Sequence, residues 1–164
     1  ETFVLDPATF RARHADWRSR VPPGFRVQRM DRDLALRSDP SLAFLWGDID
    51  SFVARALGYC VLREDQVVSR CSPVALGDKR FETGVGTAEA YRRRGLATLA
   101  CCAFVEHSLD IGLKPEWGCV YNEASKGLAT KLGFVPAASV QAHYMPYLKP
   151  AARSFGLPGC AIVR

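Results

Sequence analysis

Residues 89–103 read EAYRRRGLATLACCA, and this stretch constrains the fold more than any other part of the chain. Three arginines, Arg92–Arg94, are followed by Gly95 and then by a run without charged residues from Leu96 to Val105. Because a helix that is apolar on every side must be buried, the run predicts a central helix over about 95–110. The basic turn therefore stands at the N-terminus of a helix that the rest of the protein surrounds.

The segments around this helix predict a single mixed α/β domain. Helices are expected at 7–19, 49–57 and 125–132, with no more than a helical turn at 31–36. Strands are expected at 25–30, 59–63, 66–72, 80–87 and 115–121, with two more from residue 134 onward. The chain has no internal repeat and no long linker, so one domain is predicted.

The composition fits an ordinary globular protein, since 48% of the 164 residues are apolar and 24% are charged. The net charge of +5 favours an anionic partner, which leaves a nucleic acid, a phosphorylated cofactor or a membrane surface open. No apolar run is long enough to span a bilayer.

The cysteines and histidines do not follow a metal-binding pattern. No two cysteines form a C-x-x-C pair, and the three histidines are scattered. We therefore expect no metal site, six free thiols and a reducing cytoplasmic location. The six cysteines are Cys60, Cys71, Cys101, Cys102, Cys119 and Cys160.

The basic turn has the features of an anion-binding site. A helix N-terminus offers backbone N–H groups and a positive dipole end, and Gly95 and Ala97 allow a ligand to approach that backbone closely. The turn lacks the G-K-[ST] of a P-loop and the G-x-G-x-x-G of a dinucleotide site. A solvated basic turn and a nucleic-acid patch are the alternatives, although only Tyr91 offers an aromatic ring among the arginines.

Two motifs resemble the GNAT N-acyltransferase superfamily. Arg92-x-x-Gly95-x-Ala97 resembles the turn with which that superfamily holds the pyrophosphate of acetyl-CoA. The stretch WGCVYNEASKGLATKLGF (117–134) resembles its later motif, in which an asparagine ends a strand and a helix ends in Lys-Leu-Gly-Phe. Its Trp-x-Cys and Asn-x-x-Ser patterns, with FETGVGT (81–87) before the turn, are similar to one bacterial branch.

The resemblance covers about 25–147 and implies the GNAT fold. This fold has a mixed, mostly antiparallel sheet of about six or seven strands flanked by helices. The CoA cleft would lie between the fourth and fifth predicted strands, 80–87 and 115–121. Residues 1–24 are then expected to be an N-terminal extension or the remnant of a longer portion, and 148–164 a C-terminal tail.

The resemblance also implies the CoA contacts. The pantetheine arm would lie along Thr83–Thr87, where Gly84 and Gly86 leave room for it, and would meet the side chain of Asn122. The alternative role of Asn122 is a cap at the strand end. The expected CoA-binding residues are Thr83, Val85, Gly86, Thr87, Arg92, Arg93, Arg94, Gly95, Leu96, Ala97, Thr98, Asn122, Ser125 and Lys126.

The expected chemistry needs a base, an oxyanion donor and an acid. Glu82 matches the strand glutamate of the superfamily and is expected to deprotonate the acceptor, directly or through water; a solvent-facing strand glutamate is the alternative. A backbone N–H near Val85 would stabilise the oxyanion. The position of the usual acidic tyrosine falls on Ala129. Tyr121 and Ser125 are the main replacements; Cys119, His143, Tyr144 and water remain open.

The predicted function is therefore acetyl transfer from acetyl-CoA to a primary amine of a small molecule, by a monomer or homodimer that binds no membrane. A longer acyl-CoA or an aminoacyl-tRNA could instead be the donor. A non-catalytic acyl-CoA-binding module is the alternative from another class, and a nucleic-acid-binding domain is less favoured.

Overall fold

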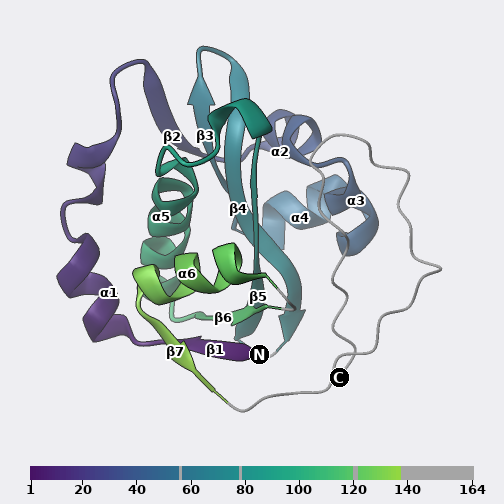
Figure 1. Cartoon of the computed structure of the whole chain (residues 1–164). Helices are drawn as coiled ribbons and strands as arrows, with labels where there is room; N and C mark the ends of the chain where they lie inside the picture. Colours follow the sequence, from purple (N-terminus) through teal and green to yellow (C-terminus); the bar gives the residue numbers. More distant parts are fainter. Residues whose placement is uncertain (56, 78, 120–121, 138–164) are drawn as a thin grey trace.

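The computed structural model describes residues 1–55, 57–77, 79–119 and 122–137. In this part of the chain seven strands form one sheet in the order β2-β3-β4-β5-β6-β1-β7 (Figure 1). All neighbouring strands are antiparallel except β5 and β6, which are parallel. The expected mixed, mostly antiparallel sheet flanked by helices is confirmed.

The secondary structure follows the predicted order closely. The strands are β1 (Thr2–Leu5), β2 (Phe25–Arg29), β3 (Tyr59–Arg63), β4 (Gln66–Gly77), β5 (Arg80–Thr87), β6 (Lys114–Gly118) and β7 (Phe134–Pro136). The helices are α1 (Pro7–His14), α2 (Arg32–Ser38), α3 (Ser41–Trp46), α4 (Ile49–Arg55), α5 (Leu96–Asp110) and α6 (Glu123–Leu132), with short 3-10 helices at Trp17–Arg20 and Glu89–Tyr91.

Side-chain caps fix where several helices begin. Asp6 accepts a hydrogen bond from the N–H of Ala8 at 3.1 Å, and Pro7 follows as the first residue of α1. Asp48 caps α4 by accepting from the N–H of Ser51 at 2.7 Å. Both helices therefore begin at the residues predicted for them, 7 and 49. Asp31 caps α2 in the same way, which explains why this segment is a full helix rather than the predicted single turn.

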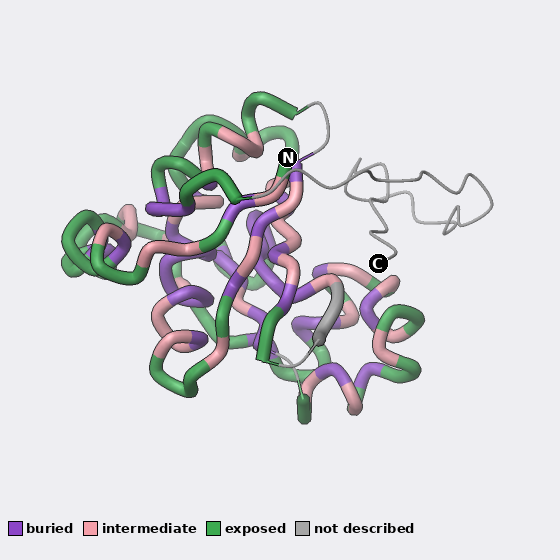
Figure 2. Tube along the Cα trace, turned by 90° about the horizontal axis from the view of Figure 1, so that it is seen from below, coloured by how far each residue is buried: buried purple, intermediate pink, exposed green. Residues whose placement is uncertain are grey.

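The sheet is covered by helices on both faces (Figure 1). On one face α5 packs against the strands, with the ring of Phe104 5.2 Å from that of Phe81. On the other face α2, α3 and α4 cover a second core that includes Leu34, Phe52 and Leu62. Figure 2 shows the buried residues gathered in the interior and the exposed ones on the outer turns.

Helix α5 is buried as its uncharged sequence predicts. Eight of its first ten residues are at most 5% exposed. These are Leu96, Leu99, Ala100, Cys101, Cys102, Ala103, Phe104 and Val105. The helix is therefore a rigid support for the basic turn at its start. The five cysteines of the described part are buried and free, and Cys160 lies outside it.

Strand β1 is the main departure from the expected fold. It lies inside the sheet between β6 and β7, and Phe3 is 1% exposed. Residues 2–5, which were expected to lie in an extension, are thus part of the sheet, and Phe25–Arg29 is the second strand rather than the first. Four residues carry too little periodicity to predict a strand, and the partners of β1 lie more than 100 residues away.

Helix α3 was also not predicted, and β6 ends at Gly118, earlier than expected. The predicted strand after residue 141 and the tail 148–164 lie outside the described residues. Within the described residues, none of the helices has the length and apolar character needed to cross a membrane.

Candidate active site

Strands β5 and β6 run side by side only at their beginnings. Beyond Glu82, β5 continues to pair with β4, whereas β6 continues beside β1. Among the residues that the structure describes, the edge of Thr83–Thr87 that faces away from β4 therefore has no strand partner. An unpaired strand edge can hydrogen-bond an extended ligand as it would another strand. The parallel pairs are Arg80 with Lys114, Phe81 with Pro115 and Glu82 with Glu116.

The basic turn leads from this edge into α5 through two residues with positive φ. Arg93 has φ 62° and Gly95, the N-cap, has φ 77°. No side chain caps the helix, so the N–H groups of its first turn, which holds Ala97 and Thr98, are left for a ligand. Apart from Gly95 itself and its two chain neighbours, no atom of the described residues lies within 4 Å of the place where a Cβ on Gly95 would stand. This geometry fits a pyrophosphate group.

The arginine side chains surround the turn from the outside. Arg92 folds back so that its Nε donates to the backbone oxygen of Thr87 at 3.2 Å. The guanidinium of Arg94 lies 5.4 Å from the ring centre of Tyr91. Leu96 is 1% exposed, so it offers only its backbone N–H to a ligand. All three arginines are exposed, so their side chains can move to meet an anion.

One polar side chain of β5 is buried without a partner. The Oγ1 of Thr83 has no hydrogen bond within the described residues, although Thr83 is only 6% exposed. Further along the strand Val85 packs against the main core, and the Oγ1 of Thr87 hydrogen-bonds the Oγ of Ser69 at 2.8 Å. Because buried polar groups are nearly always satisfied, Thr83 is a candidate contact for a polar ligand in the opening.

The glycines of β5 make room for side chains of β4. A Cβ on Gly84 would stand 2.5 Å from Cγ2 of Val74, and one on Gly86 would stand 3.4 Å from Nε of Arg70. Val74 reaches this position because the register shifts beside it. On that face of the strand the space beside the two glycines is taken by Val74 and Arg70, and the approach of the pantetheine arm along the strand edge stays a prediction.

Arg70 forms a buried ion pair that the sequence did not reveal. Its Nη2 pairs with Oδ2 of Asp39, and the two side chains are 7% and 16% exposed. Asp39 also accepts hydrogen bonds from the N–H and Oγ of Ser41 at 3.0 and 2.6 Å. Burial lowers the pKa of Arg70, while the charge of Asp39 opposes that shift. The pair fastens the junction of α2 and α3 to β4 beside Gly86.

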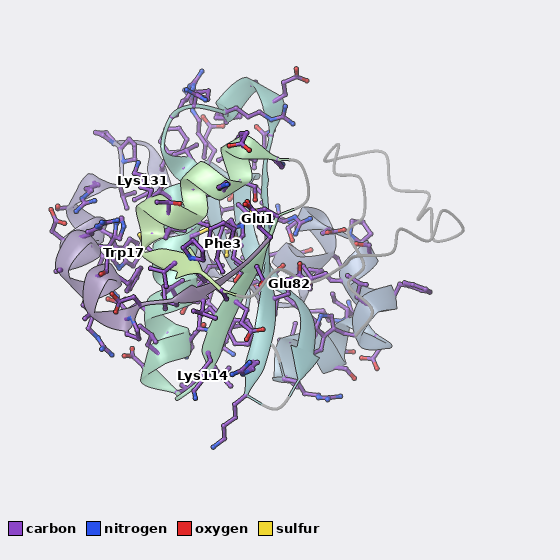
Figure 3. The ribbon with its side chains drawn as sticks, turned by 60° about the horizontal axis from the view of Figure 1, so that its bottom comes forward. Glu1, Phe3, Trp17, Glu82, Lys114 and Lys131 are labelled. Carbon is purple, nitrogen blue, oxygen red and sulfur yellow. The ribbon has the colours of Figure 1, made fainter. Side chains whose placement is uncertain are left out.

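Glu82 lies at the point where β5 and β6 diverge (Figure 3). Its neighbour in sequence, Phe81, packs on α5, and side chains alternate along a strand, so Glu82 points to the face covered by α2–α4. The side chain is half-buried. Glu116, opposite it on β6, accepts a hydrogen bond from Arg80 at 2.9 Å. A carboxylate here can receive a proton from a group approaching on that face.

Four residues of the second motif form hydrogen bonds with one another at the start of α6. The Oδ1 of Asn122 accepts from the N–H of Ser125 at 3.0 Å, so Asn122 is the N-cap of α6. The alternative interpretation expected a cap at this residue, but placed it at the strand end. The Nε1 of Trp117 donates to the Oγ of Ser125 at 2.9 Å, and the Sγ of Cys119 donates to the same oxygen at 3.4 Å. The sequence pattern includes all four residues, but no role was predicted for Trp117.

Lys126 and Ala129 follow this cluster along α6. The Nζ of Lys126 forms an ion pair with Oε2 of Glu1 at 2.8 Å, and this hydrogen bond raises the pKa of Lys126. Tyr121 lies outside the described residues. Ala129, at the position of the usual tyrosine, is fully buried in the core. The described residues include no group of three or more potential ligands placed to hold a metal ion.

The family model described as GNAT acetyltransferase matches residues 3–142. The chain belongs to the GNAT acetyltransferase family. This GNAT chain is 32% identical over 129 residues to YdfB of Bacillus subtilis (strain 168), named as an uncharacterized N-acetyltransferase. The match covers 76% of this chain and 49% of YdfB, so the chain spans about half the length of that curated relative.

Solved structures of other GNAT proteins share the fold. A GCN5-related N-acetyltransferase-like protein from Streptococcus suis superposes with a TM-score of 0.65 and 29% identity, over 82% of this chain and 57% of the other. An aminoglycoside N-acetyltransferase in complex with CoA gives a TM-score of 0.54 over 77% of this chain and 99% of the other. At 14% identity, the second likeness shows the fold alone.

Proposed function

We propose that this protein transfers an acetyl group from acetyl-CoA to a primary amine of a small molecule. The observation that carries the proposal is the unpaired edge of Thr83–Thr87, which leads directly to the uncapped N-terminus of α5. One continuous path is thereby open to an extended arm and, at its end, to a pyrophosphate. The membership of the chain in an acetyltransferase family supports the same conclusion.

The path assigns contacts to both parts of CoA. The pyrophosphate accepts hydrogen bonds from the N–H groups of the first turn of α5, and the exposed side chains of Arg92–Arg94 neutralise its charge. The pantetheine arm hydrogen-bonds the free edge of Thr83–Thr87, where the unpartnered hydroxyl of Thr83 also becomes satisfied. The side-chain Nδ2 of Asn122, whose Oδ1 serves as a cap, donates to the arm from the opposite side.

The chemistry takes place where β5 and β6 diverge. Glu82 accepts the proton of the acceptor amine, directly or through a water molecule, and the neutral amine attacks the thioester carbonyl. The backbone N–H near Val85 stabilises the oxyanion that forms. The acceptor enters from the face of α2–α4, because the side chain of Glu82 points to that face. We further propose that the protein acts in the cytoplasm as a monomer or homodimer, without a metal.

An amine-bearing small molecule is the proposed acceptor, and aminoglycosides are among the compounds to test, since a protein of the same fold is named for them. The second candidate function is a non-catalytic acyl-CoA-binding module. It is favoured by one observation: Ala129 occupies the position of the usual acid.

Acetyl-CoA turnover separates these two functions. Purified protein is mixed with acetyl-CoA and with kanamycin, spermidine, tryptamine or glycine, and the released CoA thiol is measured. We expect amine-dependent release with at least one compound, and an acetylated amine by mass spectrometry. Tight binding of acetyl-CoA without thiol release for any amine would support the binding module instead.

A further inference from the structure

The hydroxyl of Ser125 is arranged so that it can only donate. A serine oxygen has two lone pairs, and here the N–H of Trp117 and the S–H of Cys119 each occupy one of them. The proton of Ser125 must therefore point away from both donors. A ligand group that meets this hydroxyl has to be a hydrogen-bond acceptor.

The donors themselves are firmly held. Trp117 is 2% exposed, and its ring lies 5.3 Å from that of Phe134. Cys119 is 6% exposed, and its backbone N–H donates to the backbone oxygen of Glu1 at 3.0 Å. Both donors lie on or just after β6, beyond the point where this strand leaves β5. The Trp117–Cys119–Ser125 cluster is therefore on the β6 side of the opening.

We propose that Ser125 is the catalytic acid of this enzyme and that Cys119 supplies its proton. This inference rests on the proposed acetyl transfer. As the tetrahedral intermediate collapses, the carbon–sulfur bond breaks and its electron pair stays on the CoA sulfur. The O–H bond of Ser125 breaks while the S–H bond of CoA forms. The S–H bond of Cys119 breaks while a new O–H bond forms on Ser125, and solvent later returns a proton to Cys119.

The chemistry of the two ends suits such a relay. CoA and Cys119 are both alkyl thiols, so the relay as a whole moves a proton from one sulfur atom to another. The anion left on Cys119 is close to the N-terminus of α6, whose dipole favours negative charge. Lys126 contributes as well: its pKa is raised chiefly by Glu1 but also by the charge of Cys119. Trp117 takes no part in the proton transfer. It is a positioning residue, because its hydrogen bond keeps the oxygen of Ser125 in place.

Four variants and a matched control test the relay. Cys119→Val removes the thiol, Cys119→Ser restores a donor, Ser125→Ala removes the acid, and the double variant removes both. Cys60→Val is the control, because the thiol of Cys60 is also buried and also donates to an oxygen, that of Gln28 at 3.6 Å, but in the other core. Circular dichroism and thermal melting establish that each variant is folded.

We expect Cys119→Val and Ser125→Ala to lower kcat by about tenfold or more, at the low end of general-acid effects, with KM for acetyl-CoA changed less than twofold. Cys119→Ser should retain most of kcat. The double variant should be no slower than Ser125→Ala, because Cys119 acts through Ser125. In mixtures of H2O and D2O, kcat of the parent should fall along a curve that indicates two moving protons, and kcat of Cys119→Val should not.

The possible contrary results distinguish a failure of the relay from a failure of the proposed acetyl transfer. If the parent acetylates an amine while Cys119→Val matches Cys60→Val in kcat and in its isotope effect, the relay fails and the proposed function stands. Additive losses in the double variant would also defeat the relay. If the parent releases no CoA with any of the four amines, the proposed function fails, and the relay fails with it.

Discussion

Replacing Gly95 by alanine separates the role of the turn in CoA binding from its role in folding. Gly95 has φ 77°, and a Cβ there would meet no protein atom within 4 Å. The variant therefore suffers no internal clash. Its only folding cost is the left-handed backbone, roughly 1–2 kcal/mol for a non-glycine residue. The smaller entropy of the unfolded chain offsets about 0.4–1 kcal/mol of that cost, which leaves a net loss near 1 kcal/mol.

Gly112, just after the other end of α5, is a matched control. Its φ is 75°, and a Cβ there would also meet nothing within 4 Å. Gly112→Ala should therefore lower the free energy of unfolding by the same amount as Gly95→Ala. Only at Gly95 would the added methyl group stand in the proposed path of the pyrophosphate, which must come within about 2.9 Å of the backbone nitrogens to accept hydrogen bonds.

We expect Gly95→Ala to bind CoA more than tenfold more weakly than the parent, a loss of at least about 1.4 kcal/mol, and Gly112→Ala to bind it as the parent does. Denaturant unfolding measures the stability of both variants, and titration calorimetry measures CoA affinity at a temperature where both are folded. The assignment of the turn is refuted if the two variants, equally destabilised, bind CoA equally well.

Three further predictions follow from individual contacts. Glu82→Gln should leave CoA affinity intact and lower turnover by roughly 10²–10⁴-fold at neutral pH. Part of the rate should return as pH rises, because the amine then loses its proton unaided. If the variant turned over at the parental rate across pH 6–9, Glu82 would not be the base. Gly84→Ala should destabilise the fold by about 1–3 kcal/mol through its clash with Val74, and Val74→Ala should rescue it in denaturant unfolding. Burial raises the pKa of Cys60 to about 11 and of Cys102 to about 12, so neither thiol should react with iodoacetamide at pH 8 until the protein unfolds. Peptide mass spectrometry identifies the labelled thiols, and rapid labelling of either one in the folded protein would contradict this prediction.

The extent to which the site could be predicted depends on how local its parts are. The strand–turn–helix of 80–110 was predictable because its signals lie within one segment: a β-rich run, a glycine in the turn, and a helix that begins with ten uncharged residues. The role of Asn122 as a cap was equally local, since its partner Ser125 lies three residues away. The contact of Glu82 with an acceptor remains a prediction, although its position at the divergence of the strands agrees with that role.

Local pattern could not predict the interactions that join distant segments. The pairing of β1 with β6 and the Arg70–Asp39 ion pair connect residues far apart in the chain. In both cases the sequence around one partner gives no information about the other. The room that Gly84 gives to Val74 exists only because β4 bulges beside β5.

The sequence by itself determined which helix is central, where most helices begin and which turn can bind an anion. These properties follow from burial and from backbone groups of neighbouring residues. The tertiary structure alone decided where β5 and β6 separate and which donors meet the oxygen of Ser125. The opening between β5 and β6 and the Trp117–Cys119–Ser125 cluster are both formed by segments from different parts of the chain. The distances between their atoms are fixed only when the whole sheet is packed between its helices.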